Sequence, residues 1–178
     1  MADFFYNILW IDDEHEGMDG LKQRAKNQEG INLVAFKSLN GGMDELERNY
    51  PFYDGVLLDA KFFENEGDSA GSEDTDNVHR AKERMLRLKK KFEVFVFTGQ
   101  AEAFKDKTFN KAFKRVYMKG DSDERDRLFR ELKEAASLQP DTQLRHSHKR
   151  VFDVCTETYI GEYAGQDLLN LLKVEDES

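Results

Sequence analysis

The chain has only one cysteine, Cys155, and two prolines among its 178 residues. A single cysteine cannot form an intrachain disulfide, and it excludes a zinc site built from several cysteines. The shortage of cysteine is consistent with a reducing compartment. Two prolines against fourteen phenylalanines favour regular elements around an aromatic core over disorder.

Long apolar runs are also missing. No stretch reaches the eighteen or so apolar residues of a membrane span, so the sequence predicts no transmembrane helix. Residues 1–5 lack a basic segment followed by a long apolar one, so we expect no signal peptide and a soluble, cytoplasmic protein. The formal net charge of −9 argues against direct nucleic-acid binding, because phosphate backbones repel such a field.

Strand-like and helix-like segments alternate along the first 139 residues. Short apolar runs predict strands at 5–11, 31–36, 53–60, 93–98 and 115–119. Apolar residues at helical spacing predict helices at 16–27, 43–49, 78–91, 101–113 and 123–138. Strands without a polar face are typical of parallel sheets covered by helices on both sides. We therefore expect residues 1–139 to form one α/β domain with a doubly wound, five-stranded parallel sheet.

Residues 63–77 do not fit either periodicity. The segment is acidic and rich in glycine and serine, so we interpret it as a loop between the third strand and the third helix. An ordinary solvated surface is the simpler explanation. A lid or a partner-docking loop beside the site is the alternative.

The character of the chain changes again after Pro140. Apolar residues recur at helical spacing from Leu144 to Tyr159, and four leucines follow within 168–172. This pattern predicts one long amphipathic helix and a shorter one, which together are too small for a core of their own. We expect the 140–178 extension to dock on the body, on a second copy or on a domain outside this chain, with 141–173 mediating dimerisation or inter-domain packing.

Chemically capable side chains stand at the ends of four predicted strands: Asp12 and Asp13, Asp59, Thr98 and Lys119. In a doubly wound sheet, ligands bind at the carboxyl ends of the strands. Three converging carboxylates repel one another, and hard oxygen ligands suit Mg²⁺, which would relieve that repulsion. A carboxylate can also accept a phosphoryl group as a nucleophile, while a hydroxyl and an amine offset the charge on that group. Each of these residues alone could be a helix cap or a surface group. Their appearance together, each at the end of a strand and in this order, is a much more specific pattern.

Four segments carry a resemblance to a known family. ILWIDDE at 8–14, VLLDA at 56–60, VFTG at 96–99 and VYMK at 116–119 resemble the motifs of the receiver domain of bacterial response regulators. The resemblance covers about residues 4–138. It implies the flavodoxin-like (βα)5 fold with strand order 2-1-3-4-5.

The resemblance also implies a role for each site residue. Asp12, Asp13, Asp59 and the backbone carbonyl of Lys61 would bind Mg²⁺, and Asp59 would be the phosphoacceptor. Thr98 and Lys119 would contact the phosphoryl group. Thr98 and Tyr117 would form the switch, with Thr98 moving toward the phosphoryl group and Tyr117 turning inward.

The implied activity is signalling. The phosphoryl group would come from a histidine kinase or a phosphotransfer protein, and slow self-hydrolysis would be the only catalysis, so the chain would not be an enzyme in the usual sense. The sequence contains no helix-turn-helix with a basic reading helix. The output would therefore be protein contact or an effector domain outside this chain.

The chain departs from the family pattern at several positions. Phe62 and Phe63 replace the usual Met-Pro pair, Gly99 replaces the common alanine, and Gly120 replaces the proline after the lysine. Without that proline we expect no cis peptide at this point, because a non-proline cis bond costs about 3 kcal/mol.

Two alternative functions therefore stay open. One is a receiver-like binding module that phosphorylation does not regulate, which the lost prolines favour. The other is a Mg²⁺-dependent phosphohydrolase. Such enzymes typically need two acidic residues with one other residue between them, whereas Asp12 and Asp13 are directly adjacent.

Overall fold

The computed structural model describes residues 5–152, 154–155 and 162–176. Its centre is a five-stranded sheet in the order β2-β1-β3-β4-β5, in which every pairing is parallel. The strands are β1 (Tyr6–Ile11), β2 (Ile31–Phe36), β3 (Gly55–Leu58), β4 (Val94–Thr98) and β5 (Arg115–Met118). The doubly wound fold and the strand order expected from the sequence are confirmed.

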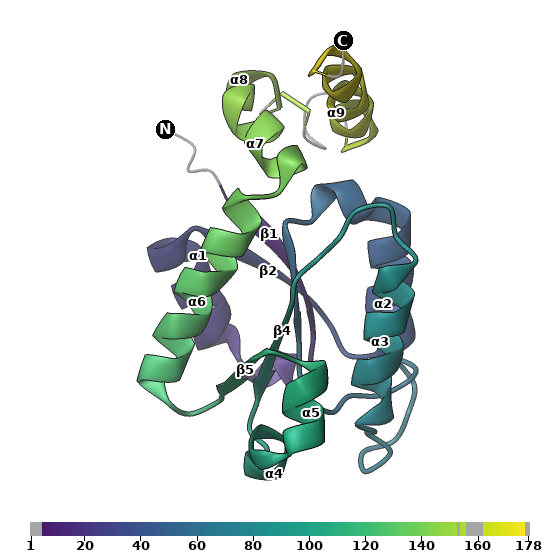
Figure 1. Ribbon diagram of the computed structural model, residues 1–178, viewed down its shortest axis with the longest axis vertical. Coiled ribbons are helices and arrows are strands. Elements are labelled where there is room, and N and C mark those ends of the chain that lie inside the picture. Colours follow the sequence, from purple (N-terminus) through teal and green to yellow (C-terminus); the bar gives the residue numbers. More distant parts are fainter. Residues whose placement is uncertain (1–4, 153, 156–161, 177–178) are drawn as a thin grey trace.

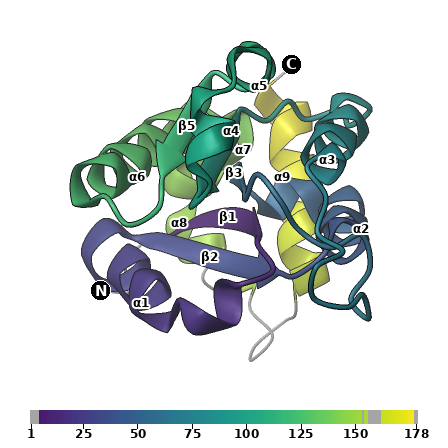
Figure 2. The same ribbon diagram turned by 90° about the horizontal axis from the view of Figure 1, so that it is seen from below.

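Helices cover both faces of the sheet (Figure 1). One face is covered by α1 (Asp19–Glu29) and α6 (Ser122–Ser137), and the other by α2 (Leu39–Asn49) and α3 (Asp76–Leu86), as Figure 2 shows. The short helices α4 (Ala101–Lys105) and α5 (Lys107–Ala112) follow β4. Two 3₁₀ turns, η1 (His15–Gly17) and η2 (Tyr50–Phe52), precede α1 and β3.

The apolar core lies in two layers because successive side chains of a strand point to opposite faces. On β1, Leu9 and Ile11 join the cluster under α2 and α3, whereas Ile8 and Trp10 join the cluster under α1 and α6. All four side chains are completely buried. This is why the strand reads as an unbroken apolar run, and why its carboxyl end is held in a fixed position.

Local signals explain several helix boundaries. Gly30, with a φ of 67°, ends α1 in the left-handed conformation that glycine adopts without a Cβ penalty. Ser38 caps α2, because its hydroxyl accepts a hydrogen bond from Gly41 N. With this cap, α2 begins at Leu39 rather than at residue 43.

The single helix predicted over 101–113 is wrong. The carboxylate of Asp106 accepts hydrogen bonds from Thr108 N and Phe109 N, which makes Asp106 the N-cap of a new helix. The periodicity of the segment continues across this cap, so periodicity alone could not reveal the break between α4 and α5.

The long helix predicted after Pro140 is also wrong. The structure has α7 (Pro140–Ser147) and the short α8 (Lys149–Phe152), and α9 (Glu162–Asp176) comes later. The end of the predicted helix at Tyr159 and the glycine break at 161 lie outside the described residues. These three helices lie together beyond one end of the sheet (Figure 1). In the described part of the chain, no helix is both long and apolar enough to cross a bilayer.

One close contact between α2 and β1 yields a test of this packing. A Cβ at Gly42 would lie 2.5 Å from Ile11 Cδ1, which is fully buried and cannot move aside freely. We expect Gly42→Ala to lower the free energy of unfolding by about 1–3 kcal/mol, because the core must shift. Gly20→Ala in α1 is the matched control, since a Cβ there meets nothing within 4 Å. It should be neutral or stabilising by up to about 1 kcal/mol. Equal effects of the two changes in urea denaturation would contradict this account.

Candidate functional site

The three predicted carboxylates meet at the carboxyl edge of the sheet. Ile11 pairs with Leu58, so the residues that follow them, Asp12 and Asp59, come side by side. Asp59 N extends the ladder by donating to Ile11 O at 2.8 Å. Ligand oxygens of Asp12, Asp13 and Asp59 all lie within 4.8 Å of one another. The predicted convergence of these carboxylates is therefore confirmed.

Lys119 reaches the same point from the end of β5. Its Nζ lies 2.6 Å from Asp12 Oδ2 and donates to Asp59 Oδ2 at 2.7 Å. Lys119 N also donates to Thr98 O at 2.8 Å, which fixes the ends of β4 and β5 against each other. No described peptide bond is cis, and Gly120 continues the chain with a φ of 86°. The amine thus reaches the carboxylates although glycine replaces the usual proline.

The carboxylates are also held by the backbone around them. Asp12 Oδ1 accepts from Glu14 N at 3.0 Å, and Asp59 Oδ1 accepts from Ala60 N at 2.6 Å. Asp12 is completely buried and Asp59 nearly so, whereas Asp13 is partly exposed. The oxygens are therefore preorganised at the site, and Asp13 lies toward the solvent side.

Burial leaves this cluster electrostatically unfavourable. Burial, with added repulsion from Asp59, raises the pKa of Asp12 to about 6, although Lys119 acts in the opposite direction. Burial also raises the pKa of Asp13. Burial alone would lower the pKa of Lys119, but the charges of Asp59 and Asp12 outweigh it and raise that pKa. A small cation that prefers hard oxygen ligands would relieve the repulsion between the carboxylates, so this set of donors fits Mg²⁺.

The shift of Asp12 predicts a dependence of stability on pH. Its pKa in the folded protein is about 6, above the ordinary value of 3.8, so the folded state holds this proton more tightly than the unfolded state. The contribution of Asp12 to stability is therefore largest below pH 3.8 and is lost as the pH rises through 6. In metal-free buffer, Asp12→Asn should raise the free energy of unfolding at pH 7 by on the order of 1–3 kcal/mol. This gain in the free energy of unfolding should shrink toward pH 4. An Asp12→Asn variant that is less stable than the wild type at pH 7 in chelator would contradict the prediction.

Thr98 and Tyr117 lie on the two strands next to the acidic site. Thr98 is completely buried, and its hydroxyl accepts from Gln100 N at 3.1 Å. Tyr117 is already buried, with its ring stacked on Phe95 at 6.2 Å between centroids. The inward turn of Tyr117 is expected only when Asp59 is phosphorylated, so the burial of the ring does not bear on that prediction. The coupled movement of the two side chains stays a prediction.

Sequence reasoning missed the partner of Tyr117. The tyrosine hydroxyl donates to the carboxylate of Glu131 on α6, which also pairs with Arg115 at 2.7 Å. Burial acts to raise the pKa of Glu131, but hydrogen bonds from Tyr117 and Arg115 outweigh it and lower that pKa. In the sequence, Glu131 is one of many charged residues on α6, and no motif marks it.

The acidic segment after β3 is a loop, as expected, and it is tied down at both ends. Phe63 O accepts from Leu39 N at 2.8 Å, and Asn77 Nδ2 donates to Phe62 O at 2.8 Å. Lys61 lies at the start of this loop and is partly buried. Its carbonyl as a metal ligand, and the loop as a lid or docking element, stay predictions.

Comparisons of the sequence find no match, whereas comparisons of the structure find similar solved proteins. No family model and no curated protein matches the chain. A response regulator receiver domain from Clostridium thermocellum has a TM-score of 0.54 at 16% identity, covering 75% of this chain and 95% of its own. A CheY-like receiver domain from Methanospirillum hungatei has a TM-score of 0.52 at 21% identity, covering 74% and 96%. A de novo designed Rossmann 2x3 protein has a TM-score of 0.50 at 16% identity, covering 75% and 94%.

The strand order defines a doubly wound α/β protein of the flavodoxin type, and the carboxylates of Asp12, Asp13 and Asp59 form an acidic edge at the carboxyl ends of its strands. More particularly, the described chain has the fold of response regulator receiver domains. Likeness at this identity concerns the fold, and a de novo designed protein is among the similar structures. The function must therefore be argued from the site.

Proposed function

We propose that this chain is a receiver domain that accepts a phosphoryl group on Asp59. The observation that carries the proposal is the position of Asp59, whose oxygen lies 2.7 Å from the Lys119 amine and beside the carboxylates of Asp12 and Asp13. The same side chains appear at the same strand ends in the receiver motifs that the sequence resembles. No group that the reaction needs is missing.

The chemistry follows from the charges at the edge. An oxygen of Asp59 attacks the phosphorus of a phosphodonor, a P–O bond to Asp59 forms, and the bond to the donor's leaving group breaks. Lys119 then pairs with a phosphoryl oxygen, and the Thr98 hydroxyl donates to another. Mg²⁺ would be held by Asp12, Asp13, Asp59 and the Lys61 carbonyl, and it supplies positive charge that offsets the charge on the transferred group.

The signal would leave the site through Thr98 and Tyr117. If the Thr98 hydroxyl turns toward the phosphoryl group, it gives up the hydrogen bond from Gln100 N. Tyr117 would then turn inward into the space that Thr98 leaves, and this rotation would remake the surface around the helices α4 and α5 and the strand β5. The donor would be a histidine kinase or a phosphotransfer protein, with slow self-hydrolysis as the only catalysis.

A binding module that phosphate does not regulate is the second candidate. The specific observation in its favour is that the Lys119 amine forms ion pairs with both Asp12 and Asp59. In this case the acidic site would be a structural ion pair that fixes the strand ends.

One experiment separates these functions. The purified chain is incubated with acetyl phosphate and Mg²⁺, and its intact mass is followed over time. The proposal predicts a gain of one phosphoryl group that requires Mg²⁺ and is prevented by a chelator. No gain would support the unregulated binding module, and steady turnover of the donor would support a phosphohydrolase.

A further inference from the structure

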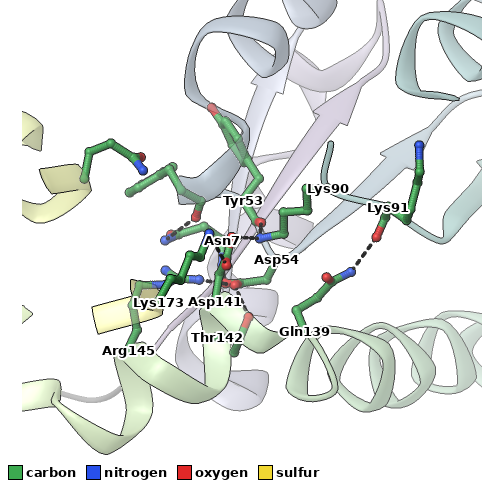
Figure 3. Close-up of polar contacts among 12 residues, drawn as sticks. Asn7, Tyr53, Asp54, Lys90, Lys91, Gln139, Asp141, Thr142, Arg145 and Lys173 are labelled. Atoms are coloured by element: carbon green, nitrogen blue, oxygen red, sulfur yellow. Dashed lines mark hydrogen bonds and ion pairs between the residues drawn. The ribbon is translucent and has the colours of Figure 1, made fainter. Parts of the chain in front are cut away.

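A second buried polar cluster lies at the other end of the strands, where β3 begins (Figure 3). Asp54 directly precedes β3, and its side chain has no exposed surface. Its Oδ2 accepts from Asn7 N at 2.8 Å, while its Oδ1 accepts from the Thr142 hydroxyl and the Arg145 guanidinium. Since Thr142 and Arg145 belong to α7, this carboxylate joins the body to the extension.

A second ion pair lies next to it, in which the body supplies the positive charge and α7 the negative one. The Lys90 side chain is 7% exposed, and its Nζ donates to Tyr53 O at 2.6 Å. The same Nζ lies 3.1 Å from Asp141 Oδ2 on α7, and Asp141 Oδ1 lies 2.6 Å from Lys173 Nζ on α9. Lys90 thus joins the body to α7, and Asp141 joins α7 to α9.

The two contacts form a complementary pattern of charge. The body presents the carboxylate of Asp54 and the ammonium of Lys90, and α7 presents Arg145 and Asp141 to meet them. Positions four residues apart share one face of a helix, so both α7 charges can meet the body at once. A helix docked in the reverse direction would place like charges together in a buried setting, which is strongly unfavourable.

The described part of the extension buries few apolar side chains completely. Within the described residues, neither core cluster includes a side chain beyond Ala136. Leu169 is the one fully buried apolar side chain in the described part of the extension, and Leu171 and Val174 on the same helix are exposed. Buried ion pairs add little net stability, but removing one partner is costly because the other charge stays buried and unpaired.

We propose that the sheet edge around Asp54 and Lys90 is a charge-selective docking surface for a helix, and that its occupant is α7 of the same chain. The pattern of charge decides whether the described parts of residues 140–176, the arm, are docked. The arm opens from a body that stays folded when the pattern is broken. Of the three docking partners that the sequence left open, this selects the body. The proposal does not depend on phosphoryl transfer at the other edge.

Hydrogen–deuterium exchange of the full chain tests this proposal. Asp54→Asn and Arg145→Gln, alone and combined, should each speed amide exchange in α7 and α9 by between about tenfold and a hundredfold. Exchange in β4 and β5 should be unchanged. The double variant should be no worse than the worse single variant, because both changes remove the same contact. Asp126→Asn is the control, since it removes an exposed pair with Arg24 that does not involve the arm.

The outcomes are distinct. Unchanged exchange in α7 and α9, or an equal rise throughout the body, would overturn the proposal. A wild-type dimer by light scattering that a cross-link shows to be joined through α7 would also overturn it, because the occupant would then be a second copy. Arg145→Gln alters only the arm, so it keeps the test readable if Asp54→Asn fails to fold.

Discussion

Asp59→Asn is expected to abolish the uptake of a phosphoryl group from acetyl phosphate. An amide is a far weaker nucleophile than a carboxylate and cannot form the acyl phosphate that the reaction requires. The substitution keeps the shape of the side chain, and its carbonyl oxygen can still accept from Ala60 N, as Asp59 Oδ1 does. The loss should therefore be chemical. Intact mass spectrometry with Mg²⁺ present measures it, and circular dichroism checks that the fold persists.

The control for this prediction is another aspartate. Asp123 is an exposed residue of the first turn of α6, far along the chain from the acidic edge. Asp123→Asn should gain a phosphoryl group at the wild-type rate. Uptake that survives in Asp59→Asn would place the acceptor on another residue and would remove the basis of the proposed function.

Lys119→Met is expected to separate phosphoryl transfer from metal binding. The amine is the fixed cation beside Asp59, so its loss should slow phosphoryl uptake by roughly a hundredfold or more. The same change leaves three carboxylates without their neutralising partner, and the apparent affinity for a divalent cation should rise several-fold. Rates come from the mass assay, and affinities come from calorimetric titration with Mg²⁺ or Mn²⁺.

Lys114→Met is the matched control, because Lys114 is an exposed lysine that precedes the same strand. It should change neither quantity. A Lys119→Met protein that takes up phosphate at the wild-type rate would show that the ion pair with Asp59 only holds the strand ends together. A fall in metal affinity would contradict the electrostatic account of the site.

Much of the acidic edge could be predicted from the sequence because its cause is local. Each strand is an apolar run that stops at a polar residue, as Ile11 stops at Asp12 and Leu58 at Asp59. In a parallel sheet the carboxyl ends of the strands share one edge, so such residues must gather there. The sequence did not predict the Glu131 partner of Tyr117, since that contact depends on how α6 rotates against β5.

The arm shows the limit of such reasoning most clearly. The sequence suggested an amphipathic helix that docks through an apolar stripe, yet Val151 on that stripe is exposed and α7 meets the body through buried ion pairs. Asp54 and Arg145 are 91 positions apart in the sequence, and nothing near either residue marks the pair. A buried ion pair of this kind has no periodicity to detect.

The sequence by itself determined the alternation of strands and helices, the parallel sheet and the set of residues at its carboxyl edge, because those follow from local pattern and chain direction. Only the tertiary structure decided where the Lys119 amine lies and which surface receives α7. Both depend on charges brought together from distant segments, where burial makes an unpaired partner too costly to leave.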